Sequence, residues 1–165
     1  MAEATTKVVT DLEKRELLAE RVFNAPRELV FKAWSEPEAL MQWWGPREWP
    51  LTVCNLDFRP GGIWHYCMTG PKGEEAWGRG VFSEIVPPER IVYSDSFSDA
   101  EGKVAENMPT MIISVDFISE GAKTRVRSLA QFASAQELQS VLDMGVVEGL
   151  TETWDRLEEY LARAK

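Results

Sequence analysis

The chain has 165 residues, of which 44% are hydrophobic and 27% charged, and its formal net charge is −9. This composition is typical of one globular domain with enough chain for a real core. The acidic balance argues against binding to nucleic acid or to an anionic membrane surface, because their phosphates attract Lys and Arg. No stretch approaches the roughly 18 apolar residues of a membrane span, so membrane insertion is not expected.

The start of the sequence predicts a short leader followed by one domain. Residues 1–12 are polar and lack the apolar segment of a secretory signal. We expect them to form a flexible leader before a single domain at residues 13–165. Cys54 and Cys67 follow neither a zinc nor a C-x-x-C spacing. Without a secretory signal they predict reduced thiols and a cytoplasmic protein, with no metal and no cofactor.

A strand and two short helices are predicted next. Residues 14–23 end at a turn and predict the first strand. Pro26 suits the first turn of a helix, and Pro37, beside a capping pattern, predicts a second one. Gly45 and Pro46 end that second helix, because glycine caps a helix and proline cannot continue it.

Six further strands are predicted before the last helix. Turn residues separate extended segments at residues 51–58, 63–68, 75–86, 90–97, 110–119 and 123–132.

Residues 134–165 predict one long amphipathic helix. Ser134 and Glu137 have the spacing of a capping box, and apolar residues then recur at helical spacing. Gly145 and Gly149 lie four apart on the apolar face, where they either let a strand approach or leave room for a ligand. A long apolar-faced helix after a series of strands is expected to cross the face of a curved antiparallel sheet.

Five motifs follow one another in a specific order and spacing. They are RVFNAP at 21–26, PEAL with WWGP at 37–46, DFRPGG at 57–62, GVFSEIVPPER at 80–90, and the segment 145–161. Together they resemble the helix-grip proteins of the START-like (SRPBCC) superfamily, within it the family named after the activator of the heat-shock protein 90 ATPase. The resemblance implies an α+β helix-grip fold, in which a curved seven-stranded antiparallel sheet wraps around a long C-terminal helix, with two short helices after the first strand.

The resemblance also implies a cavity between sheet and helix, where relatives in the wider superfamily bind lipids, sterols, hormones or polyketides. Alternation puts Trp64 and Tyr66 on one face of their strand, and relatives carry charged residues on the other, so the Trp64 face is expected to point inward. The residues expected to line the cavity are Trp43, Trp64, Tyr66, Met68, Trp77, Arg79, Tyr93, Phe117, Met144, Gly145 and Gly149.

No catalytic residue is assigned from the sequence. His65 is the only histidine, faces away from the expected cavity, and has no metal-ligand or triad partner at a suitable spacing. Glu84 and Asp116 alternate outward on their strands. A cyclase-type site needs as little as one tyrosine and one arginine, for instance Tyr66 with Arg79.

Three functions remain open, and we rank them in this order. The first is binding of a hydrophobic small molecule, lipid or aromatic and polyketide-like, without chemistry. The second is a protein-interaction module that contacts a chaperone or another copy of the chain, and the third is a cyclase or dehydratase. A large apolar cavity favours binding, a cavity with a buried polar pair favours an enzyme, and a filled cavity with an exposed apolar patch favours interaction.

Overall fold

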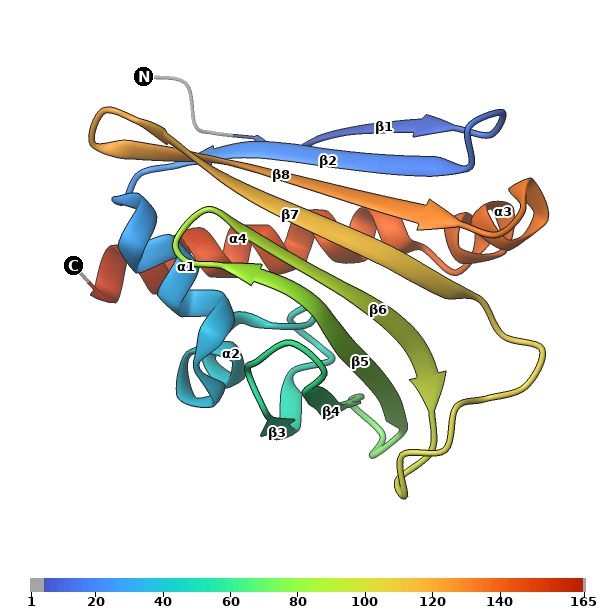
Figure 1. The fold of residues 1–165 in the computed structure, drawn as a ribbon. Coiled ribbons are helices and arrows are strands. Elements are labelled where there is room, and N and C mark those ends of the chain that lie inside the picture. The colour runs from blue at the N-terminus through green and yellow to red at the C-terminus, as the bar shows by residue number, and fades with distance from the viewer. Residues whose placement is uncertain (1–4, 165) are drawn as a thin grey trace.

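The computed structural model describes residues 5–164 and shows an antiparallel sheet with helices on one side (Figure 1). The strands are β1 (Lys7–Asp11), β2 (Glu16–Phe23), β3 (Leu51–Leu56), β4 (Ile63–Thr69), β5 (Glu75–Val86), β6 (Arg90–Ser98), β7 (Thr110–Glu120) and β8 (Lys123–Phe132). Their order in the sheet is β1-β2-β8-β7-β6-β5-β4-β3. The predicted strands are confirmed, and their ends shift by two residues at most.

The sheet has eight strands, so the expectation of seven is wrong by one. The additional strand is β1, which pairs with β2 so that Val8 lies opposite Ala19. It comes from residues 1–12, the expected leader, of which residues 1–4 lie outside the described residues. β1 is an edge strand with mostly exposed side chains, so it lacks the apolar alternation that predicts a half-buried strand.

Two short helices follow β2, as predicted: α1 (Arg27–Ser35) and α2 (Pro37–Trp43). Pro37 occupies the first turn of α2, where its missing N–H is not needed. Gly45 has a φ of +93°, which side-chain-bearing residues rarely adopt, and it turns the chain away from α2. In the folded chain α2 packs beside β3, and α1 packs against β7 and β8.

The expected single C-terminal helix is wrong, because the chain forms α3 (Ala135–Asp143) and α4 (Val146–Ala164). Ser134 caps α3 as predicted: its Oγ accepts a hydrogen bond from the Glu137 N–H at 3.1 Å. Gly145 has a φ of +86° and its N–H donates to the Leu142 carbonyl, which ends α3. Gly145 therefore lies in the break and does not share a helix face with Gly149.

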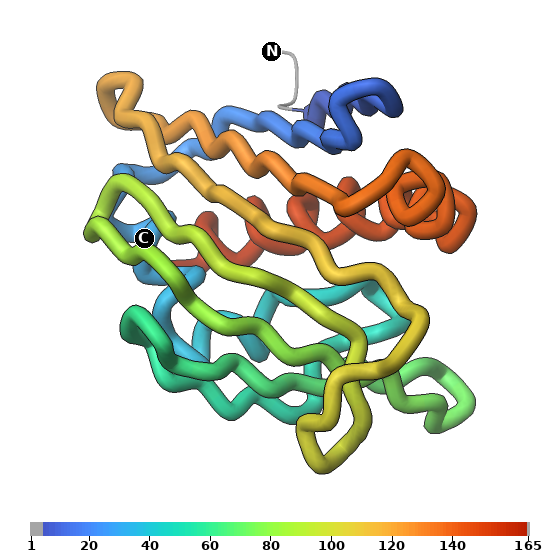
Figure 2. The backbone as a smooth tube through the Cα atoms, turned by 45° about the vertical axis from the view of Figure 1, so that its right-hand side comes forward, coloured from blue at the N-terminus to red at the C-terminus, as the bar shows by residue number. Residues whose placement is uncertain are grey.

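The helix α4 lies across one face of the curved sheet (Figure 2). Its buried stripe contains Trp154, Leu157 and Leu161, and Trp154 packs edge-on against Phe23 of β2 with ring centroids 5.7 Å apart. The sheet and α4 thus share one core. Within residues 5–164, no helix combines the length and the apolar character needed to cross a membrane.

Candidate functional site

A cavity of about 360 Å³ lies between the inner face of the sheet and the helices α3 and α4. Its wall is mostly apolar and is formed by Leu17, Trp34, Trp44, Gly45, Pro46, Tyr66, Met68, Tyr93, Asp95, Phe97, Met111, Ile113, Val115, Ser128, Ala130, Val141, Met144, Gly145, Val146, Gly149, Leu150, Thr153 and Trp154. Met144 lines the cavity and is also 53% exposed, so the cavity reaches solvent beside the break between α3 and α4. Its size and lining are those of a small-molecule site.

The structure places several of the expected residues on this wall. They are Tyr66, Met68, Tyr93, Met144, Gly145 and Gly149. Trp64 points inward as expected, but it lies behind the wall, packed against Trp44 and Tyr66 at centroid distances of 4.8 and 4.5 Å. Trp43 and Phe117 are not on the wall either, because both are fully buried around Trp34 in the core beneath α1 and α2.

The expectation for Trp77 and Arg79 needs correction, because both lie on the outer face of the sheet. Residues paired across two antiparallel strands point to the same side, and Arg79 pairs with His65 while Trp77 pairs with Cys67. Trp77 stacks on His65 with ring centroids 4.8 Å apart. The suggested pair of Tyr66 with Arg79 is therefore not formed, since the two side chains lie on opposite faces.

Two neighbouring inner positions of β5, Gly78 and Gly80, are glycines, and the first of them allows a contact between β4 and β6. A Cβ at Gly78 would lie 2.3 Å from Cζ of Tyr66, closer than any stable contact. Without that atom, the Tyr66 ring crosses over β5, and its hydroxyl donates to both carboxylate oxygens of Asp95 on β6, at 2.9 and 3.0 Å. The Tyr66–Asp95 pair thus depends on a glycine in the strand between them.

Asp95 is the polar centre of the cavity wall. The residue is only 8% exposed, and burial raises the pKa of its carboxyl to about 7, although hydrogen bonds from the Tyr66 hydroxyl and the Ser96 N–H lower it. Burial, together with the nearby Asp95 charge, raises the pKa of Tyr66 and of Tyr93 well above the usual range. At neutral pH the carboxyl is therefore poised between its two forms, while both phenols keep their protons.

The sequence prediction omits Asp95 from the cavity, although one signal for it exists. Asp95 alternates with Tyr93 and Phe97 on β6, and Tyr93 was expected to face inward. The same alternation therefore predicts an inward carboxylate. The contact between Asp95 and Tyr66 has no such signal, because it joins β4 and β6, which are not neighbours in the sheet.

Arg156 of α4 supports the part of the cavity wall that lies between α2 and β3. Its guanidinium donates to the carbonyls of Gln42, Trp44 and Gly45 at 3.2, 3.2 and 2.8 Å. These carbonyls lie at the end of α2, where the last turn of a helix leaves acceptors without intrahelical partners. Arg156 thus fixes the segment that carries Trp44 and Gly45 against α4.

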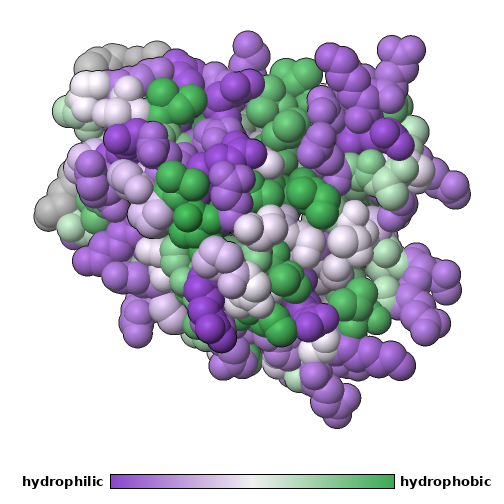
Figure 3. Space-filling model, in the orientation of Figure 1, coloured by the Kyte–Doolittle hydropathy of each residue, from purple (hydrophilic) through white to green (hydrophobic). Residues whose placement is uncertain are grey.

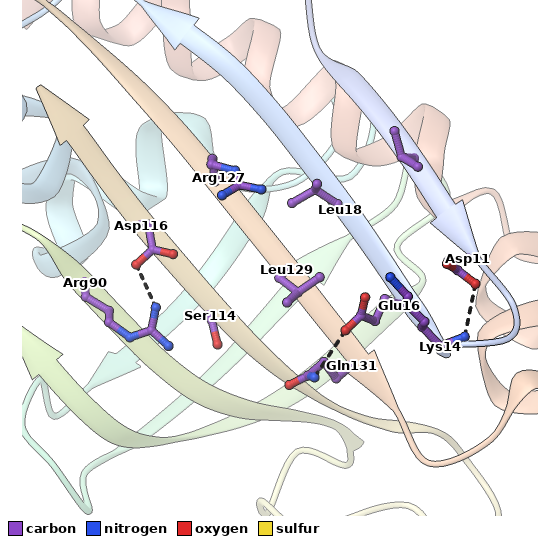
Figure 4. A pocket seen from close by; sticks show the side chains of 11 residues that line it. Asp11, Lys14, Glu16, Leu18, Arg90, Ser114, Asp116, Arg127, Leu129 and Gln131 are labelled. Carbon is purple, nitrogen blue, oxygen red and sulfur yellow. Dashed lines mark hydrogen bonds and ion pairs between the residues drawn. The ribbon is translucent and has the colours of Figure 1, made fainter. Parts of the chain in front are cut away.

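A second depression, of about 460 Å³, lies on the outer face of the sheet across β1, β2, β8 and β7 (Figure 4). Two of its arginines form ion pairs. Arg90 donates to Asp116 at 2.7 Å, and Arg127 donates to Glu20 at 2.9 Å. Within the described residues, no group of three or more potential metal ligands is found. The outer depression thus combines these ion pairs with the apolar side chains of Val9, Leu18 and Leu129.

A curved antiparallel sheet gripping a C-terminal helix, with a cavity between them, defines a helix-grip domain of the START-like superfamily. The model of the family described as "Activator of Hsp90 ATPase homolog 1-like protein" matches residues 24–162, and the chain belongs to this family. No curated protein matches the sequence significantly.

Several solved structures are similar over almost the whole chain. The crystal structure of protein Ms6760 from Mycobacterium smegmatis is 32% identical, covers 95% of this chain and 96% of that chain, and has a TM-score of 0.88. A solution structure of a protein from Arthrobacter aurescens is 29% identical, with coverages of 95% and 91% and a TM-score of 0.90. The AHSA1 protein from Silicibacter pomeroyi shares the fold at 22% identity, with coverages of 91% and 99% and a TM-score of 0.75.

Proposed function

We propose that this protein binds a hydrophobic small molecule in the cavity between the sheet and α4. The observation that carries the proposal is the cavity itself, which is large enough for such a ligand and is walled mainly by apolar and aromatic side chains. The core around α1 and α2 is tightly packed with aromatic rings, yet this neighbouring space is left open. An opening beside Met144 gives a ligand a route from solvent.

The surface offers less support for the alternative of an interaction module. Large apolar side chains are exposed at Val9, Ile112 and Ile118. In the view of Figure 3, however, hydrophobic groups are interspersed with hydrophilic ones. A docking surface of that kind is expected to show a contiguous apolar patch.

The test is a titration with the neutral apolar probe N-phenyl-1-naphthylamine, read by probe emission and by quenching of tryptophan. Ala130→Phe fills the cavity from β8, and Leu129→Phe makes the matched change on the outer face of the same strand. Wild type and Leu129→Phe should bind one probe per chain. Ala130→Phe should bind at least about tenfold more weakly, because the added ring occupies the site.

Two results would contradict the proposal. One is the absence of saturable binding by folded wild-type protein, which would move protein interaction to first place. The other is equal binding by all three proteins, which would locate the probe outside the cavity.

The Tyr66–Asp95 pair supports a second candidate, acid–base chemistry on the bound molecule. A carboxyl with a pKa near neutrality both takes and gives protons at physiological pH, and a buried polar pair in an apolar cavity is the arrangement expected of an enzyme of this fold. Here Asp95 would remove a proton from a carbon next to a ligand carbonyl.

Deuterium exchange tests this second candidate directly. Decan-2-one in D₂O should exchange the protons beside its carbonyl faster with wild type than with Asp95→Asn, as followed by NMR. Equal rates for the two proteins, with the ketone bound to both, would reject acid–base chemistry and leave ligand binding alone.

A further inference from the structure

Asp95 is the only charged residue on the cavity wall, among the residues that the structure describes. Its neighbours on the flanking strands, Gly80 and Met111, carry no polar group that compensates the charge. The Tyr66 hydroxyl donates to the carboxyl. A carboxylate has about four acceptor positions, so part of its capacity remains open to a molecule in the cavity.

This arrangement discriminates between classes of hydrophobic ligand. A fatty acid would place a second carboxylate near the first in a poorly solvated space, where like charges repel strongly. A pure hydrocarbon or an ester offers no hydrogen-bond donor and leaves the open acceptors of Asp95 unpaired, which is unfavourable in a buried site. A cationic donor satisfies both the charge and the acceptors.

We infer that the cavity takes hydrophobic amines, with the ammonium group on Asp95 and the apolar body against the aromatic wall. The inference rests on the proposed function, that the cavity binds a hydrophobic molecule at all. Tyr66 and Tyr93 line the cavity together with Asp95, and aromatic rings near an ammonium group add cation–π attraction. The net charge of −9 also favours approach of a cation.

The surroundings of Asp95 predict how binding responds to pH. The titratable groups that face it are Tyr66 from β4 and Tyr93 from its own strand, and both keep their protons near neutrality. The flanking strands contribute Gly80 and Met111, and α4 contributes only uncharged residues to the wall. Asp95 is therefore the single group whose ionisation changes between pH 5 and pH 8 at this site, and an ammonium ligand needs its ionised form.

The experiment compares three probes with one apolar chain: decylamine, decan-1-ol and decanoate, each displacing N-phenyl-1-naphthylamine at pH 8 and physiological salt. Decylamine should bind at least about tenfold more tightly than decan-1-ol, as expected for hydrogen bonding to a charged partner. Decanoate should bind most weakly. Asp95→Asn should remove the preference for the amine, and Asp116→Asn, which deletes the same charge on the outer face, should preserve it.

A pH series on wild-type protein keeps the test decisive if Asp95→Asn fails to fold. Affinity for decylamine should rise up to about tenfold per pH unit below pH 7 and level off above it, whereas affinity for decan-1-ol should stay nearly constant. Equal affinities for the three probes, or tighter binding of decanoate, would overturn the amine inference while the proposed function stands. Failure of the naphthylamine probe itself to bind would overturn both.

Discussion

Replacing Asp95 by asparagine is expected to stabilise the protein at pH 8, because the native carboxyl is ionised there in a buried site. Burial raises the pKa of the Asp95 carboxyl from 3.8 to about 7. At pH values between these two, the folded chain keeps a proton that the unfolded chain releases. The free energy of unfolding therefore falls as pH rises through this window and is level above it. A shift of roughly three pKa units corresponds to about 4 kcal/mol lost at pH 8.

The asparagine variant has no charge to bury, and its amide oxygen accepts the Tyr66 hydroxyl. We expect Asp95→Asn to gain between about 1 and 4 kcal/mol at pH 8, the lower values allowing for imperfect amide hydrogen bonding. The difference in unfolding free energy between variant and wild type should grow by about 2 to 3 kcal/mol from pH 5 to pH 8. Urea unfolding followed by tryptophan emission measures it, and other titrating groups cancel in the difference.

The control is the same substitution at Asp116, which pairs with Arg90 on the partly exposed outer face. Surface ion pairs contribute about 0 to 1 kcal/mol, so Asp116→Asn should be neutral or slightly destabilising. The reasoning about Asp95 is refuted if Asp95→Asn is less stable than wild type at pH 8, or if its stability difference does not change with pH.

Three further substitutions, one of them with a matched control, test the architecture of the site by urea unfolding. Gly78→Ala should lower the free energy of unfolding by about 1 to 3 kcal/mol, because the added Cβ collides with the Tyr66 ring. The control Gly80→Ala, whose added Cβ has its nearest contacts at 3.4 Å, should change stability by less than about 1 kcal/mol. Equal effects of the two substitutions would contradict the crossing of the Tyr66 ring over β5. Arg156→Lys keeps the positive charge but loses the guanidinium hydrogen bonds to the end of α2, and should lower the free energy of unfolding by about 1 to 3 kcal/mol. An unchanged urea midpoint would mean that these hydrogen bonds do not contribute to stability. Gly145→Ala should lose about 1 kcal/mol or more from its positive φ, and a gain would indicate a continuous helix.

The strands and the two short helices could be predicted from sequence because their signals are local. Alternation and turn residues bound each strand, and Pro37 and Gly45 mark the ends of α2. The edge strand β1 was missed because most of its side chains face solvent, and extended backbone alone leaves no hydrophobic pattern. The break at Gly145 was missed because apolar spacing continues past it, and a glycine within a helix pattern is ambiguous.

The cavity wall could be predicted only where a strand carries its own alternation. On β4 this pattern correctly separates Trp64 and Tyr66 from His65. On β5 it fails around the cavity, because the inward positions 78 and 80 are glycines and the aromatic residue beside them, Trp77, faces outward. Glycine carries no hydrophobic signal, so the space above Gly78, and with it the link from Tyr66 to β6, emerges only from the folded sheet.

The most direct test of ligand binding uses the methionine methyl groups as reporters, labelled with ¹³C and observed by NMR. Met68, Met111 and Met144 line the cavity, whereas Met41 and Met108 are exposed elsewhere on the surface. Titration with N-phenyl-1-naphthylamine should shift the first three methyl signals and saturate at one equivalent, while the other two stay in place. Shifts confined to Met41 and Met108, or no shifts at all, would contradict a ligand site between the sheet and α4.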